Sequence, residues 1–204
     1  MGLFRTDTQD LSDERLMEKV VRGDERAFAA LYDRYQRKLM AYFCRMLWND
    51  REKAQDFLQD LFTKIAQKPQ SYDPSRPFST WLYSVANNMC KNEYRSAETR
   101  KAAVPHLKHA SNGHEKPDHG TEVDRERFRD RLEEELAKLD PDHKATFVMR
   151  YNEDMAIKEI AAVFAISEGT VKSRLFYTVK KLAERLNEFD PRILSHGTAR
   201  TIRP

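Results

Sequence analysis

Segment 97–124 interrupts the periodic pattern of the chain and limits the folds that the chain can adopt. Residues 101–124 read KAAVPHLKHASNGHEKPDHGTEVD, with two prolines, two glycines, four histidines and no sustained spacing of apolar residues. A compact domain rarely contains an unstructured connection of this length. The sequence therefore predicts two lobes, at 11–96 and 125–189, joined by a flexible linker at 97–124 and followed by a disordered tail at 190–204.

Both lobes show the spacing of apolar residues that is typical of amphipathic helices. The first lobe has several such stretches. Asp24 precedes one of them as an N-cap, and Ser79 or Thr80 can cap the last. In the second lobe, Asp140 followed by Pro141 is a typical helix start. No segment alternates polar and apolar residues over a useful length, so we expect an all-α fold.

The composition excludes several classes of protein. The chain has 204 residues, of which 40% are hydrophobic and 34% charged. It has no run of about 20 apolar residues that could span a bilayer, and Leu3 and Phe4 are followed by Arg5 rather than by an apolar signal sequence. Cys44 and Cys90 are too few for a disulfide framework or a zinc site. We therefore expect a cytoplasmic protein with buried thiols.

The stretch IAAVFAISEGTVKSRLFYTV, Ile160 to Val179, indicates two short helices on either side of a corner. Its apolar residues form a seam on both inner faces, and Ala161 is small enough for a close helix crossing. Ser167 stands where an N-cap of the second helix belongs. The outer face of that helix is polar and basic. This combination is typical of a helix-turn-helix, whose second helix enters the major groove of DNA.

The corner of this motif carries Ala165, where glycine is common. If the backbone there adopts positive φ, alanine costs roughly 1 kcal/mol relative to glycine. That cost is small enough to be tolerated.

Four segments together resemble the extracytoplasmic-function (ECF) group of bacterial sigma factors, in the sigma-70 family. GDERAFAALYDRY is similar to the opening helices of that family, and QDFLQDLFTKI to its helix that binds core RNA polymerase. SYDPSRPFSTWLYSVANN resembles the loop and helix that capture the −10 promoter element, and EIAAVFAISEGTVKSRL the −35 reader. The resemblance implies a region 2-like lobe of four helices and a region 4-like helix-turn-helix lobe.

The resemblance also implies partners and site residues. The partners are core RNA polymerase and promoter DNA, as a −35 duplex and a melted −10 strand. The residues implied to face polymerase are Asp56, Gln59, Asp60 and Phe62. Those implied at the −10 element are Tyr72, Asp73, Phe78, Asn88 and Asn92, since aromatic rings and amides suit unpaired bases. Trp81 and Tyr83 would shape that helix, and we expect Trp81 to be a core anchor.

At the −35 element the resemblance implies a set of DNA-binding residues. Within this set, Arg150 would clamp a phosphate. The set is Arg150, Ser167, Thr170, Lys172, Ser173, Arg174, Phe176 and Tyr177. Tyr177 and Ser84 stand where relatives often carry basic residues. Both departures should weaken attraction to the DNA backbone.

The polymerase-binding segment also departs from the family pattern, because Gln55 takes a position that is often acidic. Thr63 lies on the same helical face as Gln59 and Asp60. Its phosphorylation would add about −1.5 to −2 charges. We therefore hypothesise that a Ser/Thr kinase acting on Thr63 gates polymerase binding; an unregulated surface threonine is the alternative. An anti-sigma factor is a further possible partner.

Other functions remain open at this point. A helix-turn-helix regulator that binds duplex DNA without replacing sigma is the main alternative, and an interaction adaptor is another. The linker histidines, His106, His109, His114 and His119, fit no compact metal site. The chain has no glycine-rich phosphate loop and no activated nucleophile, so we expect no enzyme activity, cofactor or metal.

Overall fold

The computed structural model describes residues 10–103 and 120–189, none of which lies in a strand. The expected all-α fold is therefore confirmed. The first lobe contains α1 (Asp13–Val21), α2 (Glu25–Met46), α3 (Arg51–Gln67), the short 3-10 helix η1 (Pro69–Ser71) and α4 (Phe78–Ala103). The second contains α5 (Gly120–Ala137), α6 (Pro141–Tyr151), α7 (Ile157–Phe164), α8 (Glu168–Arg185) and the 3-10 helix η2 (Asn187–Phe189).

Local capping explains where several helices begin. Asp24 Oδ1 accepts hydrogen bonds from the backbone amides of Arg26 at 3.0 Å and Ala27 at 3.2 Å, before α2. Asp140 Oδ1 accepts one from the amide of Asp142 at 2.9 Å, and Pro141 opens α6. Both predicted caps are confirmed, because each depends on atoms only two or three residues away.

The helices extend into the predicted linker from both sides. α4 continues to Ala103 and α5 begins at Gly120, so the expected boundaries at 97 and 124 were too wide. The intervening residues 104–119, with the four histidines, lie outside the described residues, as does the predicted tail at 190–204.

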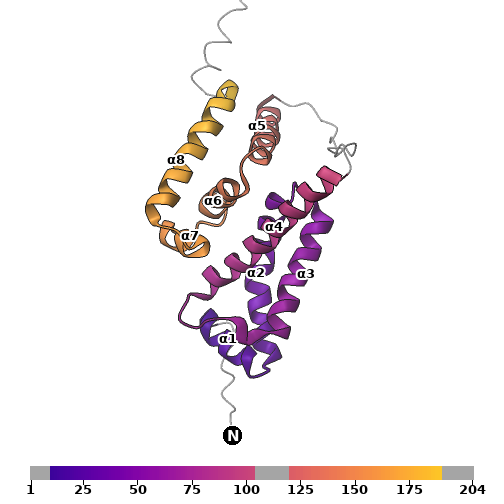
Figure 1. Ribbon diagram of the computed structural model, residues 1–204, viewed down its shortest axis with the longest axis vertical. Helices are drawn as coiled ribbons and strands as arrows, with labels where there is room; N and C mark the ends of the chain where they lie inside the picture. The colour runs from indigo at the N-terminus through magenta and orange to yellow at the C-terminus, as the bar shows by residue number, and fades with distance from the viewer. Residues whose placement is uncertain (1–9, 104–119, 190–204) are drawn as a thin grey trace, which may run out of the picture.

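The hydrophobic core runs without a break from the first lobe into the second. Tyr42 of α2 and Ala86 of α4 share one buried cluster with Val148 of α6 and Ile160 of α7. α4 contacts α7, and α2 contacts α6. Figure 1 shows α7 and α8 on one flank of the molecule and α3 on the other. The two lobes, expected to be separate on a tether, are therefore packed together in this structure.

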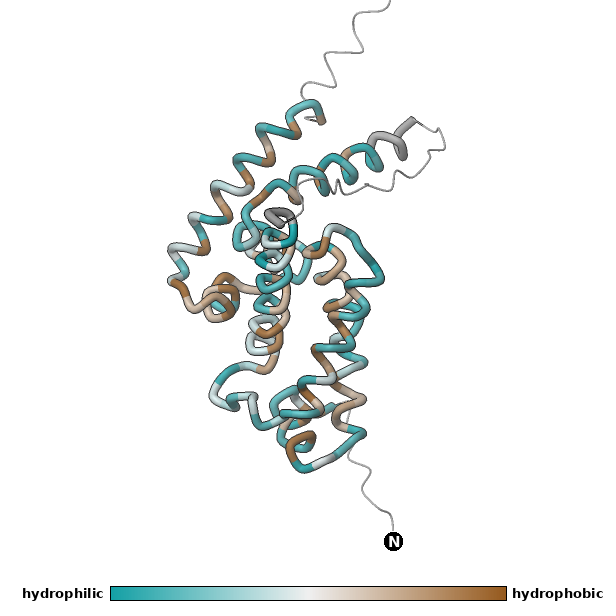
Figure 2. Tube along the Cα trace, turned by 45° about the vertical axis from the view of Figure 1, so that its right-hand side comes forward, coloured by the Kyte–Doolittle hydropathy of each residue, from teal (hydrophilic) through white to brown (hydrophobic). Residues whose placement is uncertain are grey.

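Helix α5 belongs to a smaller cluster of its own. Leu136 of α5 and Leu139, just after that helix, pack with Leu182 of α8 and Leu186, the residue that follows α8. Figure 2 shows α5 as largely hydrophilic and the short α7 as largely hydrophobic. α5 therefore packs through the small cluster, whereas α7 contributes buried residues to the main core.

The two cysteines are free thiols. Cys90 is buried in α4, and burial raises its pKa to about 12, whereas Cys44 is half-buried. Among the described helices, none combines the length and apolar character needed to cross a membrane.

Candidate nucleic-acid and polymerase interface

The outer face of α3 presents the polar residues that were predicted to face polymerase. Asp50 caps the helix by accepting from the amide of Lys53 at 3.0 Å. Asp56, Gln59 and Asp60 are exposed, and so is Thr63. The opposite face is buried in the core through Ala54, Leu58, Leu61, Phe62 and Ile65. The helical repeat thus separates a packing face from an available polar face.

Phe62 does not share the outer face of α3, which corrects its predicted placement. Its relative exposure is 4%. Its ring packs edge-on against Tyr32, with centroids 4.7 Å apart, and against Phe28 at 6.0 Å. Phe62 therefore supports α3 from beneath and offers a partner little surface.

A shallow groove runs between α2 and α3 beside this face. Its volume is about 400 Å³, and Phe28, Tyr32 and Phe62 contribute to its lining. Gln55, Gln59 and Thr63 line it from α3. The groove combines an apolar floor with a polar rim, as a helix-binding surface requires.

The loop from Tyr72 to Phe78 is held in shape by aromatic packing. Tyr72 is buried, and its hydroxyl donates to the carbonyl of Arg76 at 2.6 Å. Its ring lies 5.6 Å from that of Phe78 and 5.4 Å from that of Trp81, centroid to centroid. Trp81 is half-buried, in keeping with its expected role as a core anchor.

Two of the residues predicted at the −10 element lie inside the fold. Phe78 is fully buried, and Tyr72 is almost so, which corrects the expectation that both meet DNA directly. Asp73 is exposed, and its Oδ1 accepts from the amide of Ser75 at 2.9 Å. Tyr72 and Phe78 shape the loop that presents Asp73.

The N-terminus of α4 is capped by a side chain of another helix, which the sequence did not predict. The amide of Phe78 donates to Glu14 Oε1 of α1 at 3.0 Å, and this bond lowers the pKa of Glu14. The helix begins at Phe78, ahead of the predicted caps Ser79 and Thr80. The Thr80 hydroxyl is buried and has no partner among the described residues. No local signal could identify Glu14, because it lies on another helix.

The middle of α4 has one exposed amide face. Asn88 and Asn92 are both exposed and lie one helical turn apart. Their neighbour Asn87 is buried and accepts a hydrogen bond from the hydroxyl of Tyr42 at 3.3 Å. Asn88 and Asn92 are therefore free to contact bases or backbone of an exposed strand, whereas Asn87 stabilises the core.

The helix-turn-helix forms as predicted. Ala165 ends α7 in the left-handed region, with φ of 53°. Ser167 caps α8 by accepting from the amide of Thr170 at 3.1 Å. The side chains exposed on α8 include those of Thr170, Lys172, Ser173, Phe176 and Tyr177. The two aromatic rings are the most exposed large apolar groups, at 65% for Phe176 and 63% for Tyr177.

Both predicted DNA-binding arginines are engaged within the chain. Arg150 donates to the carbonyl of Met155 at 3.0 Å and so holds the turn between α6 and α7. Arg174 Nη2 lies 3.4 Å from Asp142 Oδ2, and its guanidinium stacks over the ring of Phe164 at 5.3 Å. In this conformation the Arg150 side chain of α6 is held at the α6–α7 turn, and the Arg174 side chain of α8 is held against Asp142 and Phe164.

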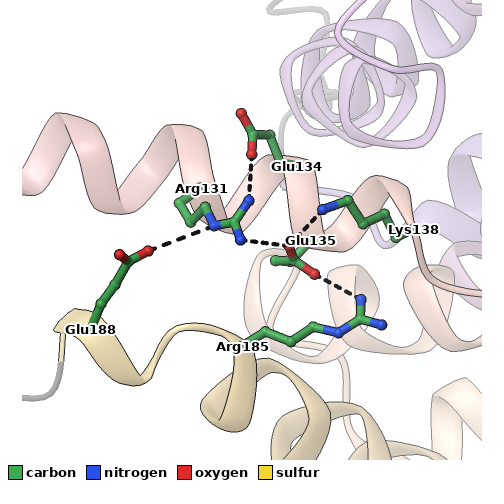
Figure 3. Close-up of polar contacts among 6 residues, drawn as sticks. All are labelled: Arg131, Glu134, Glu135, Lys138, Arg185 and Glu188. Carbon is green, nitrogen blue, oxygen red and sulfur yellow. Dashed lines mark hydrogen bonds and ion pairs between the residues drawn. The ribbon is translucent and has the colours of Figure 1, made fainter.

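A cluster of charged residues attaches α5 to the end of α8 (Figure 3). The side chain of Glu135 is 3% exposed, and its two oxygens lie 2.7 Å from Lys138 and 2.7 Å from Arg185. Arg131 joins it at 3.3 Å and also reaches Glu188 at 3.7 Å. The hydrogen bonds to Lys138 and Arg185 lower the pKa of Glu135. This cluster fixes α5 beside the end of α8, away from the exposed side chains near Ser167.

Comparisons with known proteins agree with this arrangement. The family model of sigma-70 region 2 matches residues 31–100, and that of sigma-70 region 4 matches residues 129–182. The ECF RNA polymerase sigma factor SigL of Mycobacterium tuberculosis is 34% identical over 160 residues, covering 78% of this chain and 88% of that protein. The RNA polymerase sigma-H factor of Pseudomonas aeruginosa is 30% identical over 177 residues, covering 80% and 88%.

Two solved structures share the fold. The sigma factor RpoE of Bartonella quintana, in complex with the anti-sigma factor NepR, aligns with a TM-score of 0.64 at 19% identity, covering 78% of this chain and 96% of that chain. CnrH, in complex with the cytosolic domain of CnrY, aligns with a TM-score of 0.63 at 24% identity, covering 86% and 97%.

Proposed function

Because the chain belongs to the extracytoplasmic-function group of the sigma-70 family of RNA polymerase sigma factors, we propose that it binds core RNA polymerase and directs it to specific promoters. One observation carries the proposal most directly. A single chain presents a polar α3 face, an amide pair on α4 and a capped, basic recognition helix α8. These are three different kinds of surface, for a protein, a melted strand and a duplex. We place this activity in the cytoplasm, where bacterial transcription occurs.

In this function α8 reads the −35 duplex. Thr170, Lys172 and Ser173 are exposed near its N-terminus, where a recognition helix meets base edges. Lys172 supplies the charge for phosphates or guanine, and the exposed ring of Phe176 suits the methyl group of thymine. Ser167 orients the helix by its cap. Tyr177 and, once released from Asp142, Arg174 complete the groove-facing set.

The first lobe binds the melted −10 strand. Asn88 and Asn92 offer donors and acceptors to unpaired bases, and Asp73 projects from the loop that Tyr72 and Phe78 support. Unpaired bases expose edges that a duplex hides, so amide side chains can read them. The buried aromatic residues set the position of this loop rather than stacking on bases.

Polymerase binds the exposed face of α3. Asp56 and Asp60 supply negative charge there, Gln59 supplies an amide, and the half-buried rings of Phe28 and Tyr32 in the adjoining groove add apolar surface. A test is a titration of fluorescently labelled protein with purified bacterial core polymerase. Asp56→Lys/Asp60→Lys should weaken binding about tenfold or more, since reversed charges face the partner. The matched control is Glu126→Lys/Asp130→Lys, on exposed positions of α5.

The same titration separates the proposal from its main alternative. A sigma factor binds core polymerase tightly and supports initiation on promoter DNA. If the wild-type chain binds duplex DNA but not polymerase, it acts instead as a helix-turn-helix regulator. If the α3 and α5 variants lost polymerase affinity equally, α3 would not be part of the polymerase interface.

We further propose that phosphorylation of Thr63 strengthens polymerase binding. Thr63 is exposed and lines the α2–α3 groove together with Gln55 and Gln59. A phosphate there would add about −1.5 to −2 charges to a face that carries Gln55 in a commonly acidic position. Thr63→Glu should bind core polymerase more tightly than Thr63→Ala, whereas Thr99→Glu, an exposed threonine of α4, should match the wild type. If Thr63→Glu and Thr63→Ala bound core polymerase equally, phosphorylation of Thr63 would not control polymerase binding.

Control by an anti-sigma factor is a separate possibility for this chain. Two solved structures that share this fold are RpoE bound to the anti-sigma factor NepR and CnrH bound to the cytosolic domain of CnrY. Affinity capture with the chain as bait, followed by a test of whether the captured protein blocks polymerase binding, would identify such a partner.

A further inference from the structure

The first turn of α1 holds the end of the loop that precedes α4. Glu14 Oε1 accepts a hydrogen bond of 3.0 Å from the backbone amide of Phe78, the first residue of α4. This bond lowers the pKa of Glu14, because the amide favours the charged carboxylate. α1 also contacts both η1 and α4, which lie on the two sides of the loop. The loop is therefore attached to a helix that comes much earlier in the chain.

The neighbouring residue Asp13 reaches the same point by a second path. Its carboxylate accepts a hydrogen bond from the hydroxyl of Tyr35 on α2 and lies 2.6 Å from Nη1 of Arg34. The ring of Tyr35 packs edge-on against that of Phe78, with centroids 5.6 Å apart. Both rings are buried. Consecutive carboxylates of α1 thus act on one residue, Glu14 on its backbone directly and Asp13 on its side chain through Tyr35.

The exposed part of the loop is a turn closed by its own hydrogen bonds. The amide of Arg76 donates to the carbonyl of Asp73 at 3.1 Å, and Asp73 Oδ1 accepts from the amide of Ser75 at 2.9 Å. Residues 73–77 are all exposed. Because the turn holds its own shape, the buried aromatic residues at its two ends set its place relative to α4.

α4 takes its cap from another helix although a local residue could supply one. The residue before the helix is Pro77, whose side chain carries no hydrogen-bond acceptor. An aspartate at that position could cap α4 in the way that Asp24 caps α2. The cap by Glu14 does the same for the helix but also ties its first turn to α1. The start of α4 in turn sets the position of Asn88 and Asn92 further along the helix.

We propose that Glu14 is a positioning residue for −10 recognition: by holding the Phe78 amide, it fixes the turn that carries Asp73 relative to the amide face of α4. The turn and the amide face then meet one melted strand in register. A site built from two elements recognises its ligand when supporting contacts fix their separation. The inference rests on the proposed sigma function for its ligand, an unpaired stretch of promoter DNA.

The first test measures the anchor without DNA. In the full chain, hydrogen exchange of the Phe78 amide, followed by NMR, should be about tenfold faster in Glu14→Ala than in the wild type. Glu14→Gln keeps an oxygen that can accept the bond and should restore most of the protection. The matched control is Asp24→Ala, which removes the cap of α2 and should leave this amide at its wild-type rate. An unchanged rate in Glu14→Ala would overturn the anchor.

The second test measures recognition by the assembled holoenzyme. Purified bacterial core polymerase carrying the full chain selects from a pool of duplexes that contain a preformed bubble of randomised unpaired bases. The wild type should enrich particular bases, and Glu14→Ala should lose about threefold to tenfold of that preference without a change in affinity for core polymerase. Glu14→Gln should restore the preference. Glu18→Ala, which removes an exposed carboxylate from the same helix, should keep it.

The outcomes separate this inference from the proposed function. If the wild type shows a base preference that Glu14→Ala retains, the positioning role is wrong and the sigma function stands. If Glu14→Ala loses preference and polymerase affinity together, Glu14 stabilises the lobe as a whole and the positioning role is again wrong. A wild type that binds polymerase but prefers no base rejects the −10 function itself.

A second variant tests the same joint if Glu14→Ala does not fold. Tyr35→Phe removes the hydroxyl that Asp13 accepts but keeps a ring against Phe78. It should show a smaller loss of base preference in the bubble pool and faster exchange of the Phe78 amide. Wild-type behaviour of Tyr35→Phe in both measurements would overturn the positioning of the loop by α1.

Discussion

The hydroxyl of Tyr83 on α4 donates a hydrogen bond of 2.6 Å to Glu153, which lies seventy residues further along the chain in the turn before α7. Both side chains are largely enclosed, and burial raises the pKa of each. The bond joins the helix assigned to the −10 element to the lobe assigned to the −35 element. It therefore makes the stability of the two lobes interdependent.

Removing the donor of this bond should destabilise the chain. Tyr83→Phe keeps the ring in place but leaves the Glu153 carboxylate enclosed without its partner, at a cost of about 1–3 kcal/mol in the free energy of unfolding. Urea unfolding followed by circular dichroism measures this. Tyr151→Phe, at a tyrosine that is 53% exposed, should change stability little. If Tyr83→Phe and Tyr151→Phe changed the free energy of unfolding by similar amounts, the stabilising role of the Tyr83–Glu153 hydrogen bond would be contradicted.

A buried lysine at the junction of the lobes should produce a pH dependence. Lys144 is 4% exposed, and burial lowers its pKa to about 8, although Cys90 and Glu133 favour the charged form. The unfolded lysine stays protonated to a higher pH than the folded one, so the free energy of unfolding should rise as pH increases through about 8. Above about pH 9 the raised pKa of Cys90 acts in the opposite direction.

The comparison between wild type and Lys144→Met isolates this effect. Between about pH 8 and 9 the wild type should gain up to about 1 kcal/mol relative to the variant. Denaturant midpoints at several pH values provide the measurement. Parallel pH profiles of the two proteins would show that Lys144 does not titrate in this range.

The corner of the helix-turn-helix carries a strain that a single substitution should relieve. Ala165 has φ of 53°, a conformation that glycine adopts more easily. Ala165→Gly should stabilise the chain by about 0.5–1 kcal/mol, after allowing for the greater freedom of glycine in the unfolded state. Thermal unfolding would detect the change. Ala162→Gly, at an exposed position within α7, should instead destabilise by about 1 kcal/mol.

The exposed residues of α8 should divide into two roles when DNA binding is measured. Lys172→Ala should weaken binding to all duplexes and reduce the salt slope by about 1, as expected for one phosphate contact. Phe176→Ala should reduce discrimination between sequences by about 1–3 kcal/mol and leave the slope unchanged. Selection from a randomised duplex pool at two salt concentrations tests both. If Phe176→Ala reduced the salt dependence of DNA binding, the role assigned to Phe176 in reading sequence would be wrong.

Features that depend on near neighbours in the chain were predictable. Asp24 and Ser167 cap the helices that follow them, as predicted, and Ala165 stands at the predicted corner, where its φ is positive. The helical repeat is consistent with the exposed face of α3 that carries Asp56, Gln59 and Asp60. Each of these depends on atoms within one turn of helix, so the order of residues determines it.

The direction of several other side chains was not predictable from that order. Phe62, Tyr72 and Phe78 were expected at binding surfaces but lie in the core, because the rings of other helices enclose them. A motif indicates that an aromatic residue is needed at a position, but it does not distinguish a ring that contacts a ligand from one that supports the contacting loop.

Local patterns in the sequence predict the helices, the caps at Asp24, Asp140 and Ser167, the corner of the helix-turn-helix and the family resemblance. Tertiary packing, in contrast, brings Glu14 to the start of α4, turns Arg174 toward Asp142 and joins the two lobes in one core. The physical reason is the range of the interactions. Caps and helical periodicity act over a few residues, whereas burial and ion pairing depend on which distant segments the packing brings together.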